Sequence, residues 1–428
     1  MTTLGGTRSR VYTGSSLRDL IERRTGDEVL ARDAALVASV LPFKVNTHAV
    51  DELVDWSRAP DDPLYRLLFP HRDMLAPADF DRLDKAAADP AGLRAAVAEI
   101  RAGMNPHPAG QLELNTPVRG LQHKYERTLL VFPRQGQTCH SYCGYCFRWA
   151  QFIGEPDLRM AVDGPETMTS YLDHHPAVSD VVLTGGDPLV MQTPLLERYV
   201  RPLLDPRYEH VESIRIGTKA VSFQPDRITA GPDADSLLRL FEDVVHAGRH
   251  LALMLHVSHP RELRTDGARK ALARLRGTGA VLRSQAPVIR RVNDDPLVWA
   301  DLWREQVRRD VLPYYLFVER DTGANHYFGV PLVRVHEIYR DALTRVSGLA
   351  RTARGPVMSV SPGKVVVDGV ADLPGGRAFA LRFLQARDPR LVGRPFYARF
   401  RADAAGWADL EPYGLADHEF FDAHGGTT

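Results

Sequence analysis

The three cysteines of this chain are the residues whose type and spacing most clearly indicate chemistry. All three lie within an eight-residue stretch of the 428-residue sequence, as Cys139, Cys143 and Cys146. A four-iron cluster is usually held by four thiolates, so a Cys-x3-Cys-x2-Cys stretch leaves one iron without a protein ligand. We therefore predict a [4Fe–4S] cluster whose open iron binds another molecule.

A zinc site and a set of buried core thiols are the alternative interpretations of these cysteines. A structural zinc site needs four ligands, commonly as two short pairs separated by a longer loop. This sequence has one compact run and no second cysteine pair. Disulfides are disfavoured by the odd number of cysteines in a large chain. The spacing therefore favours the iron–sulfur interpretation.

The composition is that of a globular protein with a large core, with 25% charged and 44% hydrophobic residues. The 54 basic and 54 acidic residues give a formal net charge of zero, so we expect no nucleic-acid partner. No apolar run of about 18 residues and no apolar secretory signal is present, so we expect neither a membrane span nor export. Because the predicted cluster is sensitive to oxygen, we expect a cytoplasmic enzyme.

The middle of the chain alternates β-branched apolar runs with amphipathic stretches. Six of these runs are predicted strands, namely Thr128–Phe132, Val181–Thr184, Ser213–Ile216, Ala252–Val257, Val281–Ala286 and Pro313–Val318. Helical spacing of apolar residues between them is clearest in Asp235–His246 and Val298–Val311. This alternation predicts a parallel α/β architecture with helices on the outside of a barrel.

Three regions are expected along the chain. Residues 1–115 read as a helical N-terminal extension, in which Pro90–Ala102 is the clearest helix. Residues 116–350 would form the barrel, and residues 351–428 a small segment of short strands and loops. This last segment would close the barrel mouth or contact another subunit.

Polar residues follow several of the predicted strands, where sites in such barrels gather. Gly185, Gly186 and Asp187 come after the second strand, where glycines let the backbone approach a ligand and a carboxylate can accept from an ammonium group. His256 and Gln285 lie at the ends of the fourth and fifth strands. A Gly-Gly-Asp triplet alone is commonly a plain turn, and a lone histidine is commonly a satisfied core residue. Their position after a three-cysteine loop favours a site.

The cysteine stretch resembles that of the radical S-adenosylmethionine (SAM) enzymes, and most of the chain resembles the lysine 2,3-aminomutase family. The blocks that carry the second resemblance are Leu41–Asn46, Asp61–Pro63, His123–Tyr125, Cys146–Arg148, Thr184–Pro188, Arg215–Ala220, His256–Pro260, Ser284–Gln285, Arg291–Asp294 and Pro313–Tyr315. The resemblance implies a partial (β/α)6 barrel of the radical SAM type. It also implies a small-molecule substrate, an electron donor such as flavodoxin or ferredoxin, and a homo-oligomer.

The same resemblance implies how SAM would bind. Its amino and carboxylate groups would chelate the open iron, and the reduced cluster would cleave it to give a 5′-deoxyadenosyl radical. Tyr145 would pack against the adenine, and Gln285 would lie on the ribose side. The remaining implied contacts are Gly185, Gly186 and Asp187 at the amino group, together with His256.

In the family the radical takes hydrogen from an amino acid bound to pyridoxal phosphate. Arg148, two residues after Cys146, matches the arginine that holds the substrate carboxylate. Bidentate arginine–carboxylate geometry suits that task, because it fixes the reacting carbon against the radical. The alternative is that Arg148 is a surface residue or adjusts the properties of the cluster.

The chain departs from the family at the pyridoxal phosphate site. The family's Schiff-base lysine lies in a glycine-rich loop before a Pro-Val-Met sequence, and the corresponding position here is Arg354. A guanidinium stays protonated and cannot form the imine in the usual way. Lys364 is the only nearby substitute, although it equally reads as a turn before the strand Val365–Val367, and we favour the turn. Lys124 and Arg127 match phosphate-binding residues, so an anion pocket can persist without pyridoxal phosphate.

A second departure concerns the aspartate that receives the distal ammonium group of lysine. Arg320 takes its place in our alignment, although a shift of one residue would restore Asp321. If Arg320 faces the cavity, it repels free lysine and favours an acidic or phosphorylated group. We therefore predict that Arg148 and Arg320 bind an anionic substrate.

Three hypotheses follow from the sequence. The first is a radical SAM enzyme that abstracts hydrogen from a small anionic amino-acid-like substrate without pyridoxal phosphate, for an elimination, epimerisation or rearrangement. The second is a pyridoxal phosphate-dependent 2,3-aminomutase that uses Lys364 and acts on an amino acid other than lysine. The third is a non-catalytic iron–sulfur or zinc protein. Neither the substrate nor the reaction after hydrogen abstraction follows from the residues.

Overall fold

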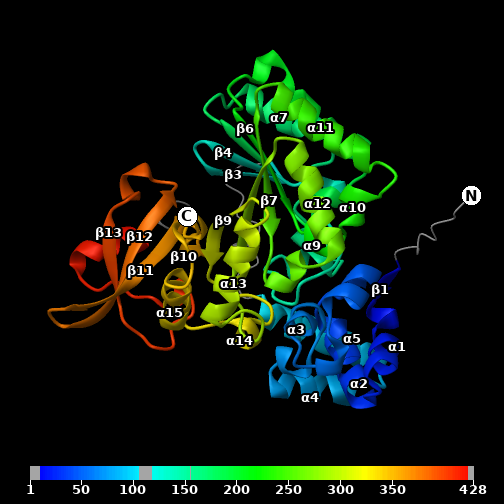
Figure 1. The fold of residues 1–428 in the computed structure, drawn as a ribbon. Helices are drawn as coiled ribbons and strands as arrows, with labels where there is room; N and C mark the ends of the chain where they lie inside the picture. The colour runs from blue at the N-terminus through cyan, green and yellow to red at the C-terminus, as the bar shows by residue number, and fades with distance from the viewer. Residues whose placement is uncertain (1–9, 106–117, 155, 423–428) are drawn as a thin grey trace, which may run out of the picture.

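A barrel built on one long sheet forms the centre of the molecule (Figure 1). The computed structural model describes residues 10–105, 118–154 and 156–422. The sheet has 11 strands in the order β13-β12-β11-β10-β9-β8-β7-β6-β5-β4-β3. Neighbouring strands from β4 to β10 are parallel, whereas β3 and the strands from β11 to β13 are antiparallel to their neighbours. This is the α/β class predicted from the sequence.

All six predicted strands are present, with ends that differ by a few residues. They are β4 (Thr128–Val131), β5 (Asp180–Leu183), β6 (Ser213–Thr218), β7 (His250–His256), β8 (Val281–Pro287) and β9 (Val311–Phe317). The hairpin strand β3 (Leu121–Tyr125) precedes them. A seventh parallel strand, β10 (Arg354–Ser359), pairs with β9, so the sheet continues into the C-terminal segment.

Helices lie between the strands and cover the outside of the sheet. They are α7 (Pro165–Asp173), α8 (Thr193–Val200), α9 (Ala220–Phe223), α10 (Asp226–Thr229), α11 (Ala234–His246), α12 (Asp266–Gly277), α13 (Pro296–Val307), α14 (Asn325–Phe328) and α15 (Leu332–Leu343). In α11, Leu237, Leu240 and Phe241 are fully buried, because apolar residues at helical spacing form one stripe against the sheet.

One predicted helix was too long at its C-terminal end. The apolar pattern of Val298–Val311 predicted a single helix, but α13 ends at Val307 and Val311 begins β9. Asp310 between them has a φ of 55°, a left-handed conformation that stops a helix. Val311 is an apolar residue of the strand that follows, and its distance in sequence from the apolar residues of α13 also fits helical spacing.

The N-terminal region is helical, as predicted, and lies at one end of the barrel (Figure 1). Its elements are β1 (Val11–Thr13), α1 (Gly14–Thr25), α2 (Glu28–Val40), β2 (Lys44–Asn46), α3 (Pro63–Leu68), α4 (Pro77–Ala86) and α5 (Pro90–Met104). These helices share one hydrophobic core with Tyr145, Trp149 and Phe328 of the barrel. The cysteine loop is therefore packed against the N-terminal region.

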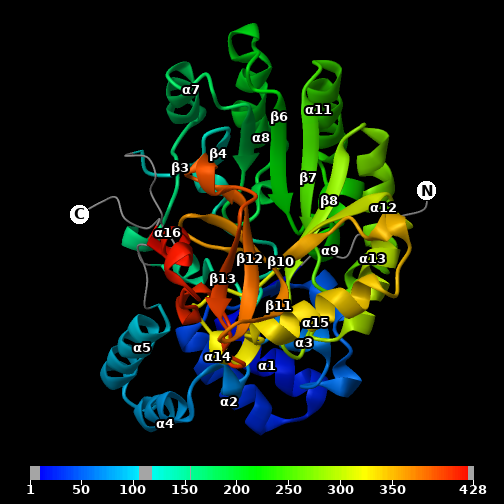
Figure 2. The same ribbon diagram turned by 90° about the vertical axis from the view of Figure 1, so that its left-hand side faces the viewer.

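The C-terminal segment is more regular than predicted. Its strands are β11 (Gly363–Leu373), β12 (Gly376–Ala386) and β13 (Pro395–Arg399), followed by the short helix α16 (His418–Phe421). Figure 2 faces these strands. The aromatic residues of the segment pack together, with the Phe396 and Phe420 ring centroids 4.5 Å apart.

Side chains close the barrel between β3 and the C-terminal strands, which form no backbone ladder with each other. Lys124 Nζ on β3 donates to Ser359 Oγ on β10 at 3.1 Å. Lys364 Nζ on β11 lies 5.3 Å from the centroid of the Tyr125 ring on β3. We call this contact region the seam, defined by Lys124, Tyr125, Ser359 and Lys364.

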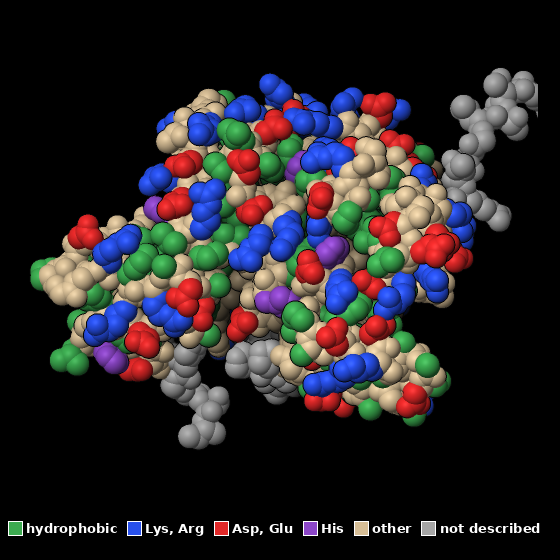
Figure 3. All heavy atoms as spheres, turned by 90° about the horizontal axis from the view of Figure 1, so that it is seen from below, with side chains coloured by type: hydrophobic (Ala, Val, Ile, Leu, Met, Phe, Trp, Pro, Cys, Tyr) green, Lys and Arg blue, Asp and Glu red, His purple; other side chains and the backbone are tan. Residues whose placement is uncertain are grey.

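Two further observations concern the surface. On the face in Figure 3, basic and acidic side chains are interspersed, which agrees with the formal net charge of zero. None of the helices in the described residues has the length and apolar character needed to cross a lipid bilayer.

Candidate active site

The cysteine loop follows β4, at the C-terminal end of the first parallel strand. Cys139, Cys143 and Cys146 are half-buried and form no disulfide. Burial raises the pKa of Cys143 to about 12 and that of Cys146 to about 11, and it raises the pKa of Cys139 well above its usual value. Such thiols become thiolates most readily when a metal centre compensates their charge.

Backbone hydrogen bonds to the N-terminal region fix the loop. Tyr142 N donates to Lys44 O at 2.8 Å, and Gly144 N donates to Leu67 O at 2.8 Å. Lys44 Nζ also donates to Thr138 Oγ1 at 3.2 Å. The residues between the cysteines therefore have partners that do not depend on a bound metal.

The loop residues fit the cluster and cofactor that the family resemblance implies. Gln137 Oε1, His140 Nε2 and Ser141 Oγ are buried without a hydrogen-bond partner. Buried polar atoms normally have partners, so such orphans mark a place where a ligand or water completes them. In the described residues, no three His, Cys, Asp or Glu side chains lie close enough together to ligate a single metal ion.

The glycines after β5 lie directly against the start of the cysteine loop. A Cβ at Gly185 would clash with the Gln137 side chain, and one at Gly186 would clash with the Thr138 backbone. Gly185 has a φ of +130°, a backbone conformation that residues other than glycine rarely adopt. Asp187 N donates to Thr138 O at 2.7 Å. The structure therefore places this motif beside the cysteine loop, and its binding of the cofactor's amino group stays a prediction.

The Asp187 carboxylate joins the ends of two strands. It is 2% exposed. Oδ2 accepts from Thr218 Oγ1 at 2.9 Å and from Lys219 N at 2.8 Å, and Oδ1 accepts from Leu189 N at 2.9 Å. Contact between this carboxylate and the SAM amino group stays a prediction. In the structure its hydrogen bonds serve the loop after β5 and the end of β6.

Tyr145 and His256 contact each other across the mouth of the barrel. Tyr145 Oη lies 2.5 Å from His256 Nε2 and 3.3 Å from Ser258 Oγ. Burial, together with the nearby Lys219 ammonium, lowers the pKa of His256 well below its usual value, so its imidazole is neutral. Packing of adenine on Tyr145 and cofactor binding by His256 stay predictions, and the structure brings both residues to the same place.

Gln285 lies beside His256. The two residues are register partners on the parallel strands β8 and β7. His259, the other histidine of the block, instead caps the turn Pro260–Leu263, where its Nδ1 accepts from Arg261 N at 3.3 Å. Of the polar residues predicted at these strand ends, His256 and Gln285 therefore share one edge, and His259 serves a turn.

Arg148 and Arg320 converge on one aromatic ring. The guanidinium carbons of Arg148 and Arg320 lie 4.8 Å and 4.6 Å from the centroid of the Phe147 ring. Arg148 also lies 4.5 Å from the Phe132 ring, and Arg320 donates to Ser359 O at 2.9 Å. The two arginines predicted to bind substrate therefore lie together directly after the last cysteine.

Glu319 is a buried acid that the sequence analysis did not single out. Burial raises its pKa well above the usual value, although the neighbouring Arg320 acts in the opposite direction. The preceding Pro-Tyr-Tyr block and the strand end at Phe317 were the available signals. These signals place an acid at the mouth of the barrel, next to Arg320.

Lys364 lies in a strand, so the turn that we favoured for it is wrong. It is the second residue of β11, and Nζ donates to Gln385 Oε1 at 2.7 Å. Its ammonium lies 5.1 Å from the Tyr315 ring centroid. Burial, with Lys124 as the largest charge effect, lowers the pKa of Lys364 to about 7. The pairing of β11 with β12, which the local sequence does not encode, carries this lysine inside.

The two other basic positions behave differently from Lys364. Arg354, at the place of the family's lysine, is exposed and lies over Tyr314 and Tyr315, 4.7 and 4.6 Å from their ring centroids. Of the proposed phosphate-binding residues, Lys124 lies in the seam, while the Arg127 side chain is exposed. The structure does not bring Lys124 and Arg127 into one buried pocket.

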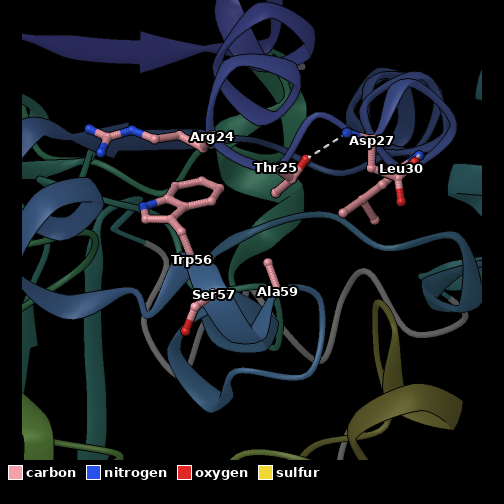
Figure 4. A pocket seen from close by; sticks show the side chains of 7 residues that line it. All are labelled: Arg24, Thr25, Asp27, Leu30, Trp56, Ser57 and Ala59. Atoms are coloured by element: carbon pink, nitrogen blue, oxygen red, sulfur yellow. Dashed lines mark hydrogen bonds between the residues drawn. The ribbon is translucent and has the colours of Figure 1, made fainter.

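A separate cavity of about 510 Å³ lies in the N-terminal region. Figure 4 shows the Trp56 indole, Arg24 and Thr25 around it. Asp27 N donates to Thr25 Oγ1 at 3.1 Å at its edge. It is lined by none of the residues that the sequence predicted to act on cofactor or substrate.

Comparison with known proteins identifies relatives over almost the whole chain. A protein of Aquifex aeolicus named “Putative L-lysine 2,3-aminomutase” is 31% identical over 400 residues, which cover 92% of this chain and 95% of that protein. L-lysine 2,3-aminomutase of Fusobacterium nucleatum is 32% identical over 55% of this chain and 52% of its own length. The Escherichia coli enzyme of that name is 28% identical over 67% of this chain and 81% of its own length.

Two further comparisons complete this picture. No family model matches the chain. Among solved structures, a radical SAM methyltransferase from Sphaerobacter thermophilus aligns with 55% of this chain and 68% of its own, with a TM-score of 0.39 and 17% identity. The relationship over the full length therefore rests on sequence.

Proposed function

This chain belongs to the lysine 2,3-aminomutase family of radical SAM enzymes, and we propose that it abstracts hydrogen from a small anionic amino-acid-like substrate without pyridoxal phosphate. The observation that carries the proposal is the convergence of Arg148 and Arg320 on Phe147, next to the cluster ligand Cys146. The bound cluster and SAM supply the hydrogen-abstracting radical. The protein's part is to bind the substrate, to orient it and to keep water away.

The two arginines suit a carboxylate or phosphate better than an ammonium group. Each guanidinium lies against an aromatic face, which holds its plane while leaving its N–H groups to hydrogen-bond. A carboxylate that binds there lies close to the cysteine loop, as abstraction at a neighbouring carbon requires. A lysine side chain placed here would bring its ammonium beside two cations, which costs free energy in a buried site.

The surroundings of the arginines keep the site apolar. Phe132 is fully buried, and Trp149 is 2% exposed with its Nε1 donating to Thr322 Oγ1 at 3.0 Å. Exclusion of water strengthens charge-assisted hydrogen bonds and protects reactive intermediates. Burial raises the pKa of Glu319 well above its usual value, and in its protonated form this carboxyl group would be able to donate a hydrogen bond to a substrate oxygen.

The test compares L-glutamate with L-lysine as probes. The reduced, cluster-reconstituted full chain is incubated with SAM and each probe, and 5′-deoxyadenosine is quantified. We expect more with L-glutamate, and we expect Arg320→Gln to reduce that excess by about tenfold or more, since a hydrogen bond to a charged group contributes about 1.5–3 kcal/mol. The exposed Arg198→Gln on α8 is the matched control. A preference for L-lysine in the unchanged protein would contradict the proposal.

A second candidate function is favoured by Lys364. A buried amine with a pKa near 7 is a competent nucleophile toward a carbonyl group, so Lys364 has the property that a Schiff-base lysine needs. In this reading the chain is a pyridoxal phosphate-dependent 2,3-aminomutase acting on an amino acid other than lysine. The seam lysine Lys124 would then lie near the phosphate.

Borohydride trapping separates the two candidates. The chain is reconstituted with pyridoxal phosphate, reduced with borohydride, digested and mapped by mass spectrometry. A pyridoxyl group on Lys364 would overturn the first candidate, and Lys364→Met should then abolish the label. Absence of both label and bound chromophore would overturn the second.

The environment and partners of the enzyme are also proposals. We propose reduction of the cluster by flavodoxin or ferredoxin in a cytoplasmic compartment, because a cluster with an open iron needs an electron donor and protection from oxygen. We further propose a homo-oligomer. Replacing chemical reductant with reduced flavodoxin in the 5′-deoxyadenosine assay tests the first point, and light scattering tests the second.

A further inference from the structure

Lys219 connects the ends of three neighbouring strands beside the cysteine loop. It directly follows β6, and its backbone N donates to Asp187 Oδ2 at 2.8 Å. Its Nζ donates to His256 O at 3.1 Å and to Glu262 Oε2 at 2.8 Å. The side chains of Lys219 and Glu262 are 12% and 0% exposed. A cation and an anion are therefore buried together at the mouth of the barrel.

Glu262 is held as firmly as Lys219. Its second oxygen, Oε1, accepts from Ser258 N at 2.8 Å and from His259 N at 2.9 Å. These bonds fix the turn that follows β7. Glu262 therefore contacts both the Lys219 ammonium and the turn after β7.

The pair lies close to the cluster ligands. The Lys219 ammonium contacts the backbone oxygen of His256, and the His256 ring contacts Tyr145. Tyr145 lies in the sequence between Cys143 and Cys146. Lys219 N also donates to Asp187 Oδ2, and Asp187 N donates to Thr138 O at 2.7 Å, directly before Cys139. Two sets of contacts therefore connect Lys219 to the cysteine loop.

The reduction potential of an iron–sulfur cluster depends on the charges and hydrogen bonds around its ligands. The reduced cluster carries one more negative charge than the oxidised one. A nearby buried cation stabilises the reduced state, and in a low-dielectric surrounding this effect is stronger than in water. An anion at a similar place has the opposite effect.

We propose that Lys219 raises the reduction potential of the cluster held by Cys139, Cys143 and Cys146, and that Glu262 opposes it. The pair then acts through its charges on the reduction potential of the cluster. If the pair only held the strand ends together, the direction in which the reduction potential shifts would not depend on which of the two charges is removed. The inference requires the cluster and is independent of the substrate.

An EPR-monitored redox titration of the reconstituted full chain tests the proposal. We expect Lys219→Met to lower the midpoint potential and Glu262→Gln to raise it, with the double variant between them. Lys219→Arg keeps the charge and should remain closer to the unchanged protein than Lys219→Met does. Lys270→Met, at an exposed lysine on α12, is the matched control and should not shift the potential.

The outcomes decide the proposal even when one variant is unstable. Shifts of the same sign in Lys219→Met and Glu262→Gln, or no shift in either, would overturn it. If Lys219→Met fails to retain the cluster, Glu262→Gln decides, since an unchanged or lowered potential in that variant contradicts the opposing role of its charge. Circular dichroism and iron content of each variant establish that folded, cluster-loaded protein is compared.

Discussion

The cysteine loop and the seam are both parts of one barrel, but they are held in different ways. The loop is fixed by main-chain hydrogen bonds, such as that from Gly144 to Leu67, and by glycines that lie against it. The seam is assembled from side chains of strands far apart in sequence, with Lys124 reaching Ser359 and Lys364 lying over Tyr125. The glycines tolerate few substitutions because a Cβ there would clash with the loop, whereas side-chain contacts in the seam can be exchanged one residue at a time.

This difference agrees with the positions at which the sequence matches the motifs of its family and those at which it departs from them. The three-cysteine loop and the Gly-Gly-Asp turn are kept. The departures, Arg354 and Arg320, lie around the seam and the arginine pair. We infer that radical initiation has been retained while substrate binding has changed.

The largest expected effect comes from removing a cluster ligand. Cys143→Ala should abolish both the visible absorbance of the reconstituted cluster and the formation of 5′-deoxyadenosine, because two thiolates cannot hold the cluster in place. The neighbouring backbone bonds of Tyr142 and Gly144 remain, so the circular dichroism spectrum should stay unchanged. Retained 5′-deoxyadenosine formation would show that these cysteines do not bind the catalytic cluster.

The next effect concerns the acid that connects the strand ends. Asp187→Ala leaves three buried donors, from Thr218, Lys219 and Leu189, without their acceptor. At about 1–3 kcal/mol for each orphaned group, the free energy of unfolding should fall by about 3 kcal/mol or more. Urea unfolding of the cluster-free protein measures the change.

The chain provides a matched control for this substitution. Asp205 caps a similar short turn by accepting from Arg207 N at 2.8 Å, but it is exposed. Asp205→Ala should cost about 1 kcal/mol or less. Equal losses in the two variants would mean that Asp187 acts only as a turn cap.

A smaller effect is expected at the arginine pair. Arg148→Lys keeps the positive charge but loses the planar fork and its contact with the Phe132 and Phe147 rings. We expect the concentration of L-glutamate that gives half-maximal 5′-deoxyadenosine formation to rise about tenfold. An unchanged value would place the carboxylate elsewhere.

The last expected effect is a change in how stability depends on pH. The pKa of Lys364 is lowered to about 7 in the folded state, so between about pH 7 and its ordinary value of 10.5 the unfolded chain binds more protons. Stability therefore gains a contribution that rises with pH across this window, with a slope of at most about 1.4 kcal/mol per pH unit.

Lys364→Met removes this contribution. The variant should show a flatter rise in the free energy of unfolding between pH 7 and pH 9 than the unchanged protein. Exposed Lys270→Met is the control and should leave the pH dependence as it is. Identical pH profiles for Lys364→Met and the unchanged protein would mean that Lys364 stays charged in the barrel.

The sequence predicted the parts of the molecule whose signals are local. The cysteine spacing, the six strand runs and the stripe of α11 each lie within a short window, and the structure contains them all. The predicted end of α13 was wrong because Val311 fits both the helical spacing of apolar residues before it and the strand pattern after it. The stretch that contains β10 was predicted only as part of a segment of short strands and loops, because its parallel pairing with β9 depends on residues about 40 positions earlier.

Residues of the candidate site could be named from the sequence, whereas the contacts between them could not. The arginines were named from alignment, but their convergence on Phe147 depends on packing. Lys364 was read as a turn residue because the pairing of β11 with β12 is not encoded in Pro362-Gly363-Lys364. Lys219 lies in the block Arg215–Ala220 that carries the family resemblance, but its ion pair with Glu262 depends on the side-by-side arrangement of three strands.

We propose that this chain starts the reaction as its family does but binds a different substrate. The most direct test incubates the reduced, reconstituted protein with SAM and L-lysine and quantifies 5′-deoxyadenosine and β-lysine together by mass spectrometry. We predict that 5′-deoxyadenosine forms and that β-lysine does not. Catalytic formation of β-lysine, or no 5′-deoxyadenosine under any reducing condition, would contradict the account.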